Sequence, residues 1–547
     1  MTFADLIRAE LVRAARAIGA PEPVDAEVER PRDPTHGDLA TNVAMLLAKP
    51  LGRKPRDIAT ALIERMQLAA CGVRTAEIAG PGFINFRIEP AALVGRVAEI
   101  VRANEAYGTS TQGGGERVVV EFVSANPTGP LHVGHGRQAA LGDAIASLLE
   151  STGWSVSREF YYNDAGAQIE NLVASVRARV AERRGEAAGI PEGGYHGEYV
   201  GELADRYAEA NPDDSRADDV GRVRTFAVDA LRREQDLDLQ AFGVHFDTYY
   251  LESSLYSDGL VDSTVSALER AGKTYEKDGA LWLATTAYGD DKDRVMRKTD
   301  GTYTYFVPDV AYHVTKWRRG FRRAIDVQGS DHHSTVTRVR AGLQALGIGI
   351  PDEYPEYVLH QLVTVMRAGS EVKISKRAGS YVTVRELIDD AGRDSVRYFF
   401  LMRRGESPLV FDVDLARTQS DENPVYYVQM AHARMCGIFR VGGIEWEGFS
   451  PDGVPYEALT EPEELDLVAH LLDYPATVQG AASALEPHRV TTYLHQAAEL
   501  AHRWYHKHHV LGNADAITRA RLALARAAQI VLRNGLSLIG VAAPERM

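Results

Sequence analysis

The chain has 547 residues, of which 45% are hydrophobic and 25% charged, and its formal net charge is −15. These values are typical of an ordinary soluble protein, and the length suits about three domains. No run of about 18 apolar residues occurs, and the N-terminus lacks a basic segment followed by an apolar one. We therefore expect neither a membrane span nor a signal peptide.

The cysteine content indicates the cellular compartment, and the net charge bears on whether the protein binds nucleic acid. The two cysteines, Cys71 and Cys436, have no CxxC partner, which argues against a disulfide framework and a Cys-based zinc site and favours a reducing cytoplasm. The acidic net charge argues only weakly against nucleic-acid binding, because binding depends on local patches. A basic run with interleaved aromatics at 316–323 could follow a phosphate backbone; alternatively, it is the solvated end of a helix with one buried aromatic.

Residues 1–107 are predicted to form a small N-terminal α+β domain. Helical periodicity occurs in three places, at 3–18, 39–47 and 55–66. Gly80-Pro81-Gly82 is a turn that opens an alternating strand. A linker rich in Gly, Ser and Thr at 108–115 marks the end of this domain.

Residues 117–415 are predicted to form a Rossmann-type, nucleotide-binding α/β catalytic domain. Strand-like runs alternate with helical patterns, at 117–123, 156–161 and 357–365. Such alternation predicts parallel strands joined by crossover helices. A polar, charged region at 177–241 is predicted to be a helical insertion, which typically carries a lid or a specificity function.

Residues 423–547 are predicted to form an all-α helix-bundle domain. Long amphipathic patterns follow one another at 463–485, 489–509 and 513–538. Trp504 and Tyr505 stand among cations, as in proteins that stack bases of single-stranded RNA; alternatively, they are core aromatics of an amphipathic helix. Met547 ends a tail that could reach an RNA base, unless the terminus is frayed.

The most informative motif is His132-Val133-Gly134-His135, between a strand-like run and a helix-like run at 138–149. A helix N-terminus offers free N–H groups and a positive dipole end to phosphate, and the imidazoles of His132 and His135 add donors. Gly134 has no side chain, so a base or a ribose can press against the backbone. The motif therefore predicts a nucleotide site.

A second motif, Lys373-Ile374-Ser375-Lys376-Arg377, lies in a Gly- and Ser-rich stretch. Two lysines on a flexible loop can fold over a triphosphate and neutralise the charge that develops on leaving pyrophosphate. A solvated basic loop is the alternative for this motif on its own. In this order, the two motifs resemble the HIGH and KMSKS elements of class I aminoacyl-tRNA synthetases, with Ile374 in place of Met.

This chemistry assigns a role to each motif residue. The site would activate a carboxylate with ATP, where positioning and charge stabilisation dominate. His132 and His135 would donate to the α-phosphate or pyrophosphate, Lys373 and Lys376 would cover the β- and γ-phosphates, and Ser375 would orient the loop. Mg²⁺ should accompany ATP, held mainly by phosphates and water. No metal site built from protein ligands is expected.

A second set of residues suits a guanidinium, which needs carboxylates and forked acceptors. Tyr305 and Asp309 lie four apart, hence on one face of a helix that starts there, although Asp309 could simply interact with the helix dipole. Glu121 is an anion in an apolar run, where a charge is costly unless paired; an edge-facing strand residue is the alternative. Asn126 could bind the substrate's carboxylate or amino group, or could serve the turn before Pro127.

The whole pattern resembles arginyl-tRNA synthetases over essentially the full chain. The segments that carry the resemblance are GDLATNVAMLLAK (37–49), GPGFINFRI (80–88), EFVSANPTGPLHVGHGR (121–137), YNDAG (162–166), DGALW (278–282), 304–313, KISKR (373–377), NPVYYVQMAHAR (423–434) and RNGLSLIGVAAPERM (533–547). The family's arginine contacts fall on Ser124, Asn126, His135, Tyr305 and Asp309, and Glu121 matches an acidic family position. Ser330 stands where some relatives have a glutamine, with Gln328 two residues earlier.

The resemblance implies ATP-dependent charging of tRNA(Arg) with L-arginine through arginyl-adenylate. It implies an N-terminal add-on domain that contacts the tRNA elbow, a Rossmann catalytic domain and a helical anticodon-binding domain, in a cytoplasmic monomer with no membrane contact. Two alternatives stay open: another class I synthetase or nucleotidyltransferase, and a tRNA-binding paralogue whose site has decayed. Intact His132, His135, Lys373 and Lys376 argue against decay.

Overall fold

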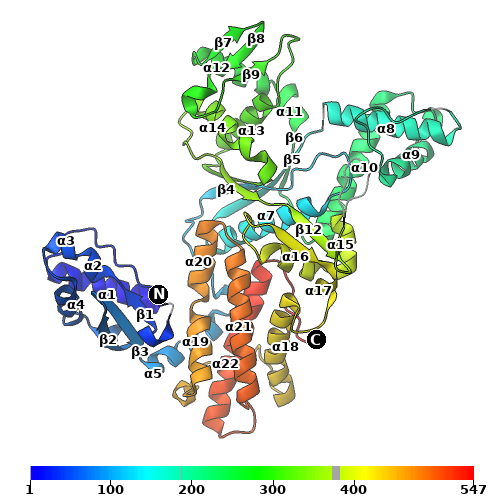
Figure 1. The fold of residues 1–547 in the computed structure, drawn as a ribbon. Helices are drawn as coiled ribbons and strands as arrows, with labels where there is room; N and C mark the ends of the chain where they lie inside the picture. Colours follow the sequence, from blue (N-terminus) through cyan, green and yellow to red (C-terminus); the bar gives the residue numbers. More distant parts are fainter. Residues whose placement is uncertain (1, 32, 165, 187, 373–381) are drawn as a thin grey trace.

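The computed structural model describes residues 2–31, 33–164, 166–186, 188–372 and 382–547. A small N-terminal domain, a central α/β domain and a C-terminal helical domain follow one another along the chain (Figure 1). This architecture confirms the predicted fold class. No helix within the described residues is long and apolar enough to cross a bilayer.

The N-terminal domain packs helices on a three-stranded antiparallel sheet of order β1-β3-β2. Its elements are α1 (Phe3–Ala17), β1 (Leu39–Thr41), α2 (Val43–Leu46), α3 (Ala48–Leu51), α4 (Pro55–Ile63), β2 (Val73–Ala79) and β3 (Phe83–Ile88). A capping box between Thr2 and Asp5 starts α1. The helix predicted at 39–47 is wrong at its start, because Leu39 pairs with Phe86 and the first three residues form β1.

The central sheet is parallel, with the order β11-β10-β4-β5-β6. Its strands are β4 (Arg117–Glu121), β5 (Ser155–Tyr162), β6 (Thr248–Leu251), β10 (Arg323–Gly329) and β11 (Glu356–His360). The chain leaves β4 toward β5 on one side and later returns as β10 on the other side. Ligands bind at such a reversal of strand order, outside the carboxyl ends of the strands.

The single strand predicted at 357–365 is wrong, because β11 ends at His360 and β12 belongs to another sheet. That second sheet has the order β13-β12-β14 and consists of β12 (Val363–Arg367), β13 (Ser370–Glu371) and β14 (Leu409–Asp412). β12 runs antiparallel to β13 and parallel to β14. A continuous apolar run in the sequence does not reveal that the chain changes sheets.

Two subdomains are inserted into the central domain (Figure 1). The first consists of α8 (Ala167–Arg183), α9 (Glu198–Ala210) and α10 (Val220–Ala241), around a small core of its own. It starts about ten residues before the predicted insertion. The second, which was not predicted, consists of α11 (Glu252–Ser257), α12 (Leu260–Arg270) and the antiparallel strands β7 (Thr274–Lys277), β8 (Ala280–Leu283) and β9 (Arg294–Arg297).

The remaining helices connect and support the sheet. They are α5 (Pro90–Gly95), α6 (Val97–Ala103), α7 (Val133–Ser151), α13 (Phe306–Arg318), α14 (His333–Ala345), α15 (Val384–Ala391), α16 (Arg393–Leu401) and α17 (Val413–Arg417). α7 joins β4 to β5 and is buried almost all round. It approaches the chain after β4 closely, because Gly142 lies against the ring of Phe122.

The C-terminal domain consists of α18 (Pro424–Gly442), α19 (Pro462–Leu472), α20 (Tyr474–Ala484), α21 (His488–Lys507) and α22 (Asp515–Leu538). The one amphipathic segment predicted at 463–485 is two helices that meet at Asp473. Pro475 explains the break, because proline has no N–H and its ring clashes with the preceding turn of a helix.

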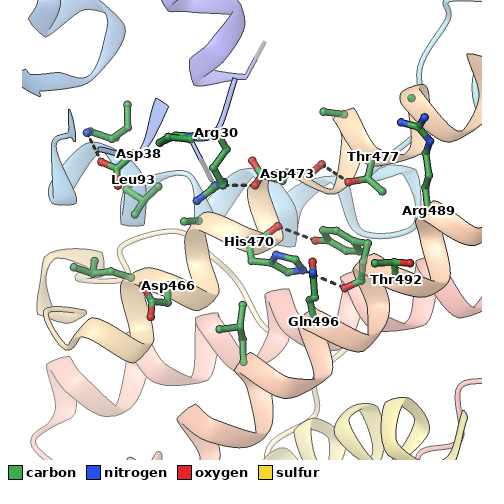
Figure 2. Close-up of a pocket in the computed structure, with 18 of the residues that line it drawn as sticks. Arg30, Asp38, Leu93, Asp466, His470, Asp473, Thr477, Arg489, Thr492 and Gln496 are labelled. Carbon is green, nitrogen blue, oxygen red and sulfur yellow. Dashed lines mark hydrogen bonds and ion pairs between the residues drawn. The ribbon is translucent and has the colours of Figure 1, made fainter. Parts of the chain in front are cut away.

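The N-terminal domain rests on α19–α21 around a cavity of about 800 Å³ (Figure 2). Arg30 forms an ion pair with Asp473 at 2.7 Å across this boundary, and Arg102 pairs with Asp452 at 2.7 Å nearby. None of the predicted site residues lines the cavity. It is therefore a feature of the domain boundary.

The close approach of α7 yields a stability prediction. A Cβ at Gly142 would lie 2.1 Å from Cγ of Phe122, which is fully buried and cannot move aside. We expect Gly142→Ala to destabilise the chain by about 1–3 kcal/mol through overpacking. Gly95→Ala is the matched control, since Gly95 also lies in a helix and a Cβ there meets nothing within 4 Å. Thermal unfolding midpoints measure both; equal midpoints would contradict the prediction.

Candidate active site

The predicted nucleotide motif caps the N-terminus of α7. The Nδ1 atom of His132 accepts a hydrogen bond from the Gly134 N–H at 3.1 Å, and Nδ1 of His135 accepts one from the His132 N–H at 3.3 Å. The two rings stack, with centroids 3.7 Å apart. A neutral imidazole that accepts through Nδ1 carries its proton on Nε2. Both rings are therefore held in the tautomer that can donate from Nε2 to a phosphate.

The chain that follows the second motif is bonded to the first. Val133 N–H donates to the Val382 carbonyl at 3.0 Å, and Val384 N–H donates to the Leu131 carbonyl at 2.9 Å. His132 and Thr383 form an antiparallel bridge between these two bonds. Lys373, Ser375 and Lys376 lie outside the described residues. The residues directly after their segment are fixed beside the His132–His135 loop.

A strained turn follows β4 at the carboxyl edge of the sheet. Val123 and Ser124 have positive φ angles of 68° and 42°, which a β-branched residue such as valine rarely adopts. The Ser124 hydroxyl donates to the Glu121 carboxylate at 2.8 Å and accepts from the Tyr161 N–H at 3.2 Å. Backbone strain of this kind costs about 1–3 kcal/mol and gathers at functional sites.

The helical insertion holds the next part of the loop. The Asn126 amide donates to Gln168 at 2.7 Å, and the Asn126 carbonyl accepts from the Gln235 amide at 3.1 Å. The same Gln235 amide reaches the Gly129 carbonyl at 2.9 Å. Gln235 on α10 was missed in the sequence, because a polar residue on a polar helix gives no signal of a contact 109 positions away.

Tyr305 and Asp309 lie at the start of α13, as the sequence predicts. Tyr305 occupies the N-cap position with 68% of its surface exposed, whereas Asp309 is partly exposed. Burial raises the pKa of Asp309 to about 7, and the negative charges of Glu252 and Glu121 add to the rise against the attraction of His313. The carboxyl of Asp309 has no recorded hydrogen bond or ion pair within the described part of the chain.

Glu252 is an acid of this region that was not predicted. It begins α11, is buried, and accepts a hydrogen bond from the Tyr161 hydroxyl at 3.0 Å. Burial raises the pKa of Glu252, and the nearby Asp164 adds to the rise. The charge of Glu252 adds to the rise in the pKa of Asp309, and both acids help to raise the pKa of the Tyr161 phenol. The region therefore has an excess of acids that a cationic ligand would stabilise.

Three of the five cations in the basic run at 316–323 are paired with acids, whereas Arg318 and Arg322 are exposed. Lys316 is fully buried and binds Glu121 and Asp326, Arg319 is paired with Glu159, and Arg323 is paired with Glu356. These cations are neutralised inside the protein. The alternative interpretation, a helix end with a buried aromatic, fits better, because Trp317 packs edge-on against Tyr354.

The predicted tRNA residues separate into two groups. Trp504 is fully buried in the helical core, so its ring cannot stack on a base and its assignment is wrong. Tyr505 and Met547 are 39% and 50% exposed and line one cavity of about 590 Å³. Arg434 lies over the Tyr505 ring at 5.8 Å. Adjacent positions on an amphipathic helix face opposite environments, which the sequence did not resolve here.

Family models match three stretches of the chain. Residues 96–400 match tRNA synthetases class I (R), catalytic domain; residues 1–88 match the arginyl tRNA synthetase N terminal domain; residues 428–547 match the DALR anticodon binding domain. The stacked histidines at the helix N-terminus belong to the central stretch. Fold and site thus define a class I aminoacyl-tRNA synthetase.

Relatives narrow this class. The chain is 54% identical to the arginine–tRNA ligase of Thiobacillus denitrificans over 98% of each chain, and 54% identical to that of Herminiimonas arsenicoxydans over 95% of each. The chain belongs to the arginyl-tRNA synthetase family. In fold it is similar to the arginyl-tRNA synthetase of Thermus thermophilus, with a TM-score of 0.78 over 100% of both chains at 23% identity. Another class I synthetase or a nucleotidyltransferase is not favoured.

The raised pKa of Asp309 yields a second stability prediction. Its folded-state pKa of about 7 lies above the ordinary 3.8, so the folded protein holds a proton that the unfolded chain releases between these values. Stability contributed by this group is therefore present below pH 4 and lost as the pH rises through 7. We expect Asp309→Asn to unfold at a higher temperature than the parent at pH 8, with a smaller difference at pH 5. A difference that does not change with pH would contradict the assignment.

Proposed function

We propose that this chain ligates L-arginine to tRNA(Arg) in two steps. In the first, the arginine carboxylate attacks the α-phosphorus of ATP, giving arginyl-adenylate and pyrophosphate. In the second, a ribose hydroxyl at the 3′ end of the tRNA takes the arginyl group and AMP leaves. The observation that carries the proposal is the pairing of Leu131–Val133 with Val382–Val384, next to an acidic region, at the carboxyl edge of the sheet.

The ATP subsite is assigned to the two motifs. His132 and His135 donate from Nε2 to the α-phosphate or pyrophosphate, and Gly134 lets the nucleotide approach the backbone. A Cβ at Gly134 would come within 2.9 Å of the His132 ring, so a side chain there would disturb the stack. Lys373 and Lys376 neutralise the β- and γ-phosphates, with Ser375 orienting their loop. Mg²⁺ bound to these phosphates would further neutralise charge on the leaving group.

The arginine subsite is assigned to the strained turn and α13. Asp309 pairs with the guanidinium, and the phenol of Tyr305 one turn earlier closes over it. Asn126 and Ser124 lie on the loop between β4 and α7 and address the amino acid's own amino and carboxylate groups. Glu121 contributes its charge from below the turn, through Ser124. Asp309, whose pKa is raised, would lose its proton when it binds a cation.

The two outer domains are assigned to the tRNA. The N-terminal domain carries a cavity of about 530 Å³ beside Phe83, whose ring is 41% exposed, and we assign it to the tRNA elbow. The cavity beside Tyr505 and Met547 is assigned to the anticodon. We further propose that the chain works as a monomer in the cytoplasm, where its two free, buried cysteines stay reduced.

Pyrophosphate exchange into ATP tests the activity directly. With tRNA(Arg) present we expect exchange with L-arginine and little with lysine or citrulline, because only a guanidinium offers charge and forked donors together. Asp309→Asn should raise the arginine KM strongly, since loss of one partner of a buried ion pair costs about 3–5 kcal/mol. Exchange with glutamine or cysteine instead would contradict the specificity. No exchange with any amino acid would indicate a tRNA-binding paralogue.

The anticodon surface yields a separate prediction. Tyr505→Ala should raise the KM for tRNA(Arg) by roughly tenfold or more, because stacking on one base contributes about 1–3 kcal/mol. The KM for ATP should not change. Tyr505→Phe keeps the ring and should behave as the parent, and Tyr275→Ala removes an equally exposed ring from β7 as a matched control. Aminoacylation kinetics measure all three variants. Equal effects of Tyr505→Ala and Tyr275→Ala on the KM for tRNA(Arg) would contradict the assignment of Tyr505 to the anticodon surface.

A further inference from the structure

Three carboxylates cross the central sheet in a single row. Asp326 on β10 is the Cα partner of Glu121 on β4, and Glu121 is the partner of Glu159 on β5. Their exposures are 0%, 6% and 0%. Like charges directly opposite one another on neighbouring strands are destabilising, and a buried charge is costly unless it is paired. The row therefore needs cations from another element.

Helix α13 lies over the row, and it provides partners for the two outer acids. Arg319 and the Tyr312 hydroxyl both donate to Glu159, at 2.6 Å each. His313 places Nε2 at 2.6 Å from Asp326 and Nδ1 at 2.7 Å from the Asp309 carbonyl.

Lys316 serves the central acid. Its ammonium is fully buried and donates to both Glu121 and Asp326, the latter at 2.8 Å. Within the described residues, Lys316 is the one cation recorded in an ion pair with Glu121. The other oxygen of Glu121 accepts from Ser124 on the strained turn. A chain of contacts thus runs from Lys316 through Glu121 to the proposed arginine subsite.

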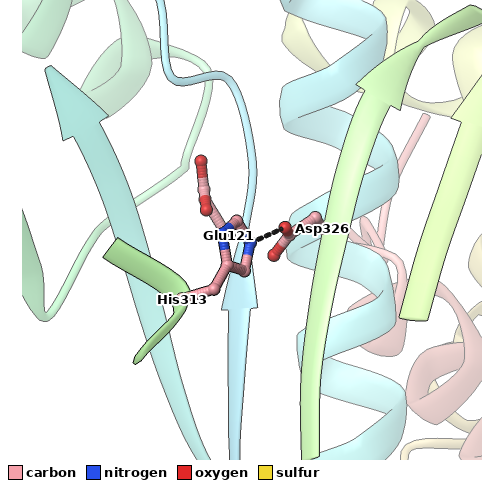
Figure 3. Close-up of side chains that lie close together, drawn as sticks. All are labelled: Glu121, His313 and Asp326. Carbon is pink, nitrogen blue, oxygen red and sulfur yellow. Dashed lines mark hydrogen bonds and ion pairs between the residues drawn. The ribbon is translucent and has the colours of Figure 1, made fainter. Parts of the chain in front are cut away.

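Without the Lys316 ammonium, the spacing of Glu121, His313 and Asp326 would suit a bound metal ion. Glu121, His313 and Asp326 each offer a ligand atom, all within 4.8 Å of one another (Figure 3). The Lys316 ammonium lies within hydrogen-bond distance of two of the three. The positive charge at this position is therefore supplied by the chain itself.

We propose that Lys316 is a positioning residue of the arginine subsite, an internal cation that holds Glu121 as a carboxylate bonded to Ser124. It thereby keeps Glu121 from taking up a proton and keeps arginine binding independent of that proton. The proposal rests on arginine being the substrate. Burial alone would raise the pKa of Asp326, but the attraction of Lys316 and His313 lowers it to about 2.

In the described part of the chain, no element other than α13 is recorded in an ion pair with Glu121 or Asp326. Tyr161 on β5 and Tyr357 on β11 face the acids, and burial raises the pKa of each phenol, so both stay neutral. Asp309 and Glu252 face them as further acids. Without Lys316, Asp326 would keep its contact with His313, whereas Glu121 would be a buried carboxylate with no other ion pair recorded in the described residues. Burial would then favour the protonated form of Glu121. The pH dependence of arginine binding therefore reports on Lys316.

The test replaces Lys316 by Met, which keeps the length of the apolar stem and removes the charge. Pyrophosphate exchange is measured from pH 6 to 8.5 with arginine or ATP varied. We expect the ratio of the arginine KM of Lys316→Met to that of the parent to grow by about tenfold for each pH unit below the titration of Glu121 in the variant. The ratio removes the titration of Asp309, which both proteins contain. The KM for ATP should stay within about twofold of the parent's.

Three further variants separate positioning from a purely structural role. Lys316→Arg keeps the charge and should show no pH-dependent ratio. Lys316→Met with Glu121→Gln removes the carboxyl group that would titrate, so the pH dependence of the ratio should disappear even if Lys316→Met alone does not fold. Lys292→Met removes an exposed lysine as a control. A constant ratio at all pH values, or equal rises of the KM for arginine and for ATP, would overturn the proposal. Failure of the parent to exchange with arginine would instead overturn the proposed function.

Discussion

The site depends on burying negative charge in the middle of a parallel sheet. Three acids in register on β10, β4 and β5 would repel one another and resist desolvation, so the fold is consistent only when α13 covers them with its polar face. That requirement fixes the position of α13 relative to the sheet. Because Asp309 and Tyr305 lie on the first turn of the same helix, it also fixes both residues at the carboxyl edge.

Helix α7 meets a second constraint, that two distant segments must come together over one nucleotide. Its N-terminus is paired with Val382–Val384, and Gly136 allows Val384 to approach closely. Arg137, the residue after Gly136, is fully buried and donates to the carbonyls of Gln361, Arg404 and Ser407. By donating to three carbonyl oxygens, the Arg137 side chain connects the loops around β12 to α7, the helix that begins at the two histidines. The proposed nucleotide site is thus assembled from one helix and the chain segments bonded to it.

Local patterns in the sequence predicted the parts of the site that one segment builds alone. The His132–His135 loop lies between a strand and a helix, and Tyr305 and Asp309 stand at a helix start, because caps and apolar periodicity are local properties. Contacts across long separations could not be predicted in this way. Lys316 resembled an exposed phosphate contact because its partner Glu121 is 195 residues away. The same limit explains why 39–47 and 357–365 were assigned wrongly, since strand partners decided both segments.

The acids that have no recorded cationic partner indicate which kind of ligand the proposed site would bind. Lys316 and Arg319 form ion pairs with the three acids of the row, and His313 contacts Asp326. Glu252 has only the neutral Tyr161 hydroxyl as its recorded side-chain partner in the described structure, and Asp309 has none. Burial raises the pKa of both acids, and the turn at Val123 and Ser124 holds backbone strain nearby. A planar cation with several donors would ionise these acids and bond to both, whereas a neutral side chain of the same shape would leave the desolvation cost in place.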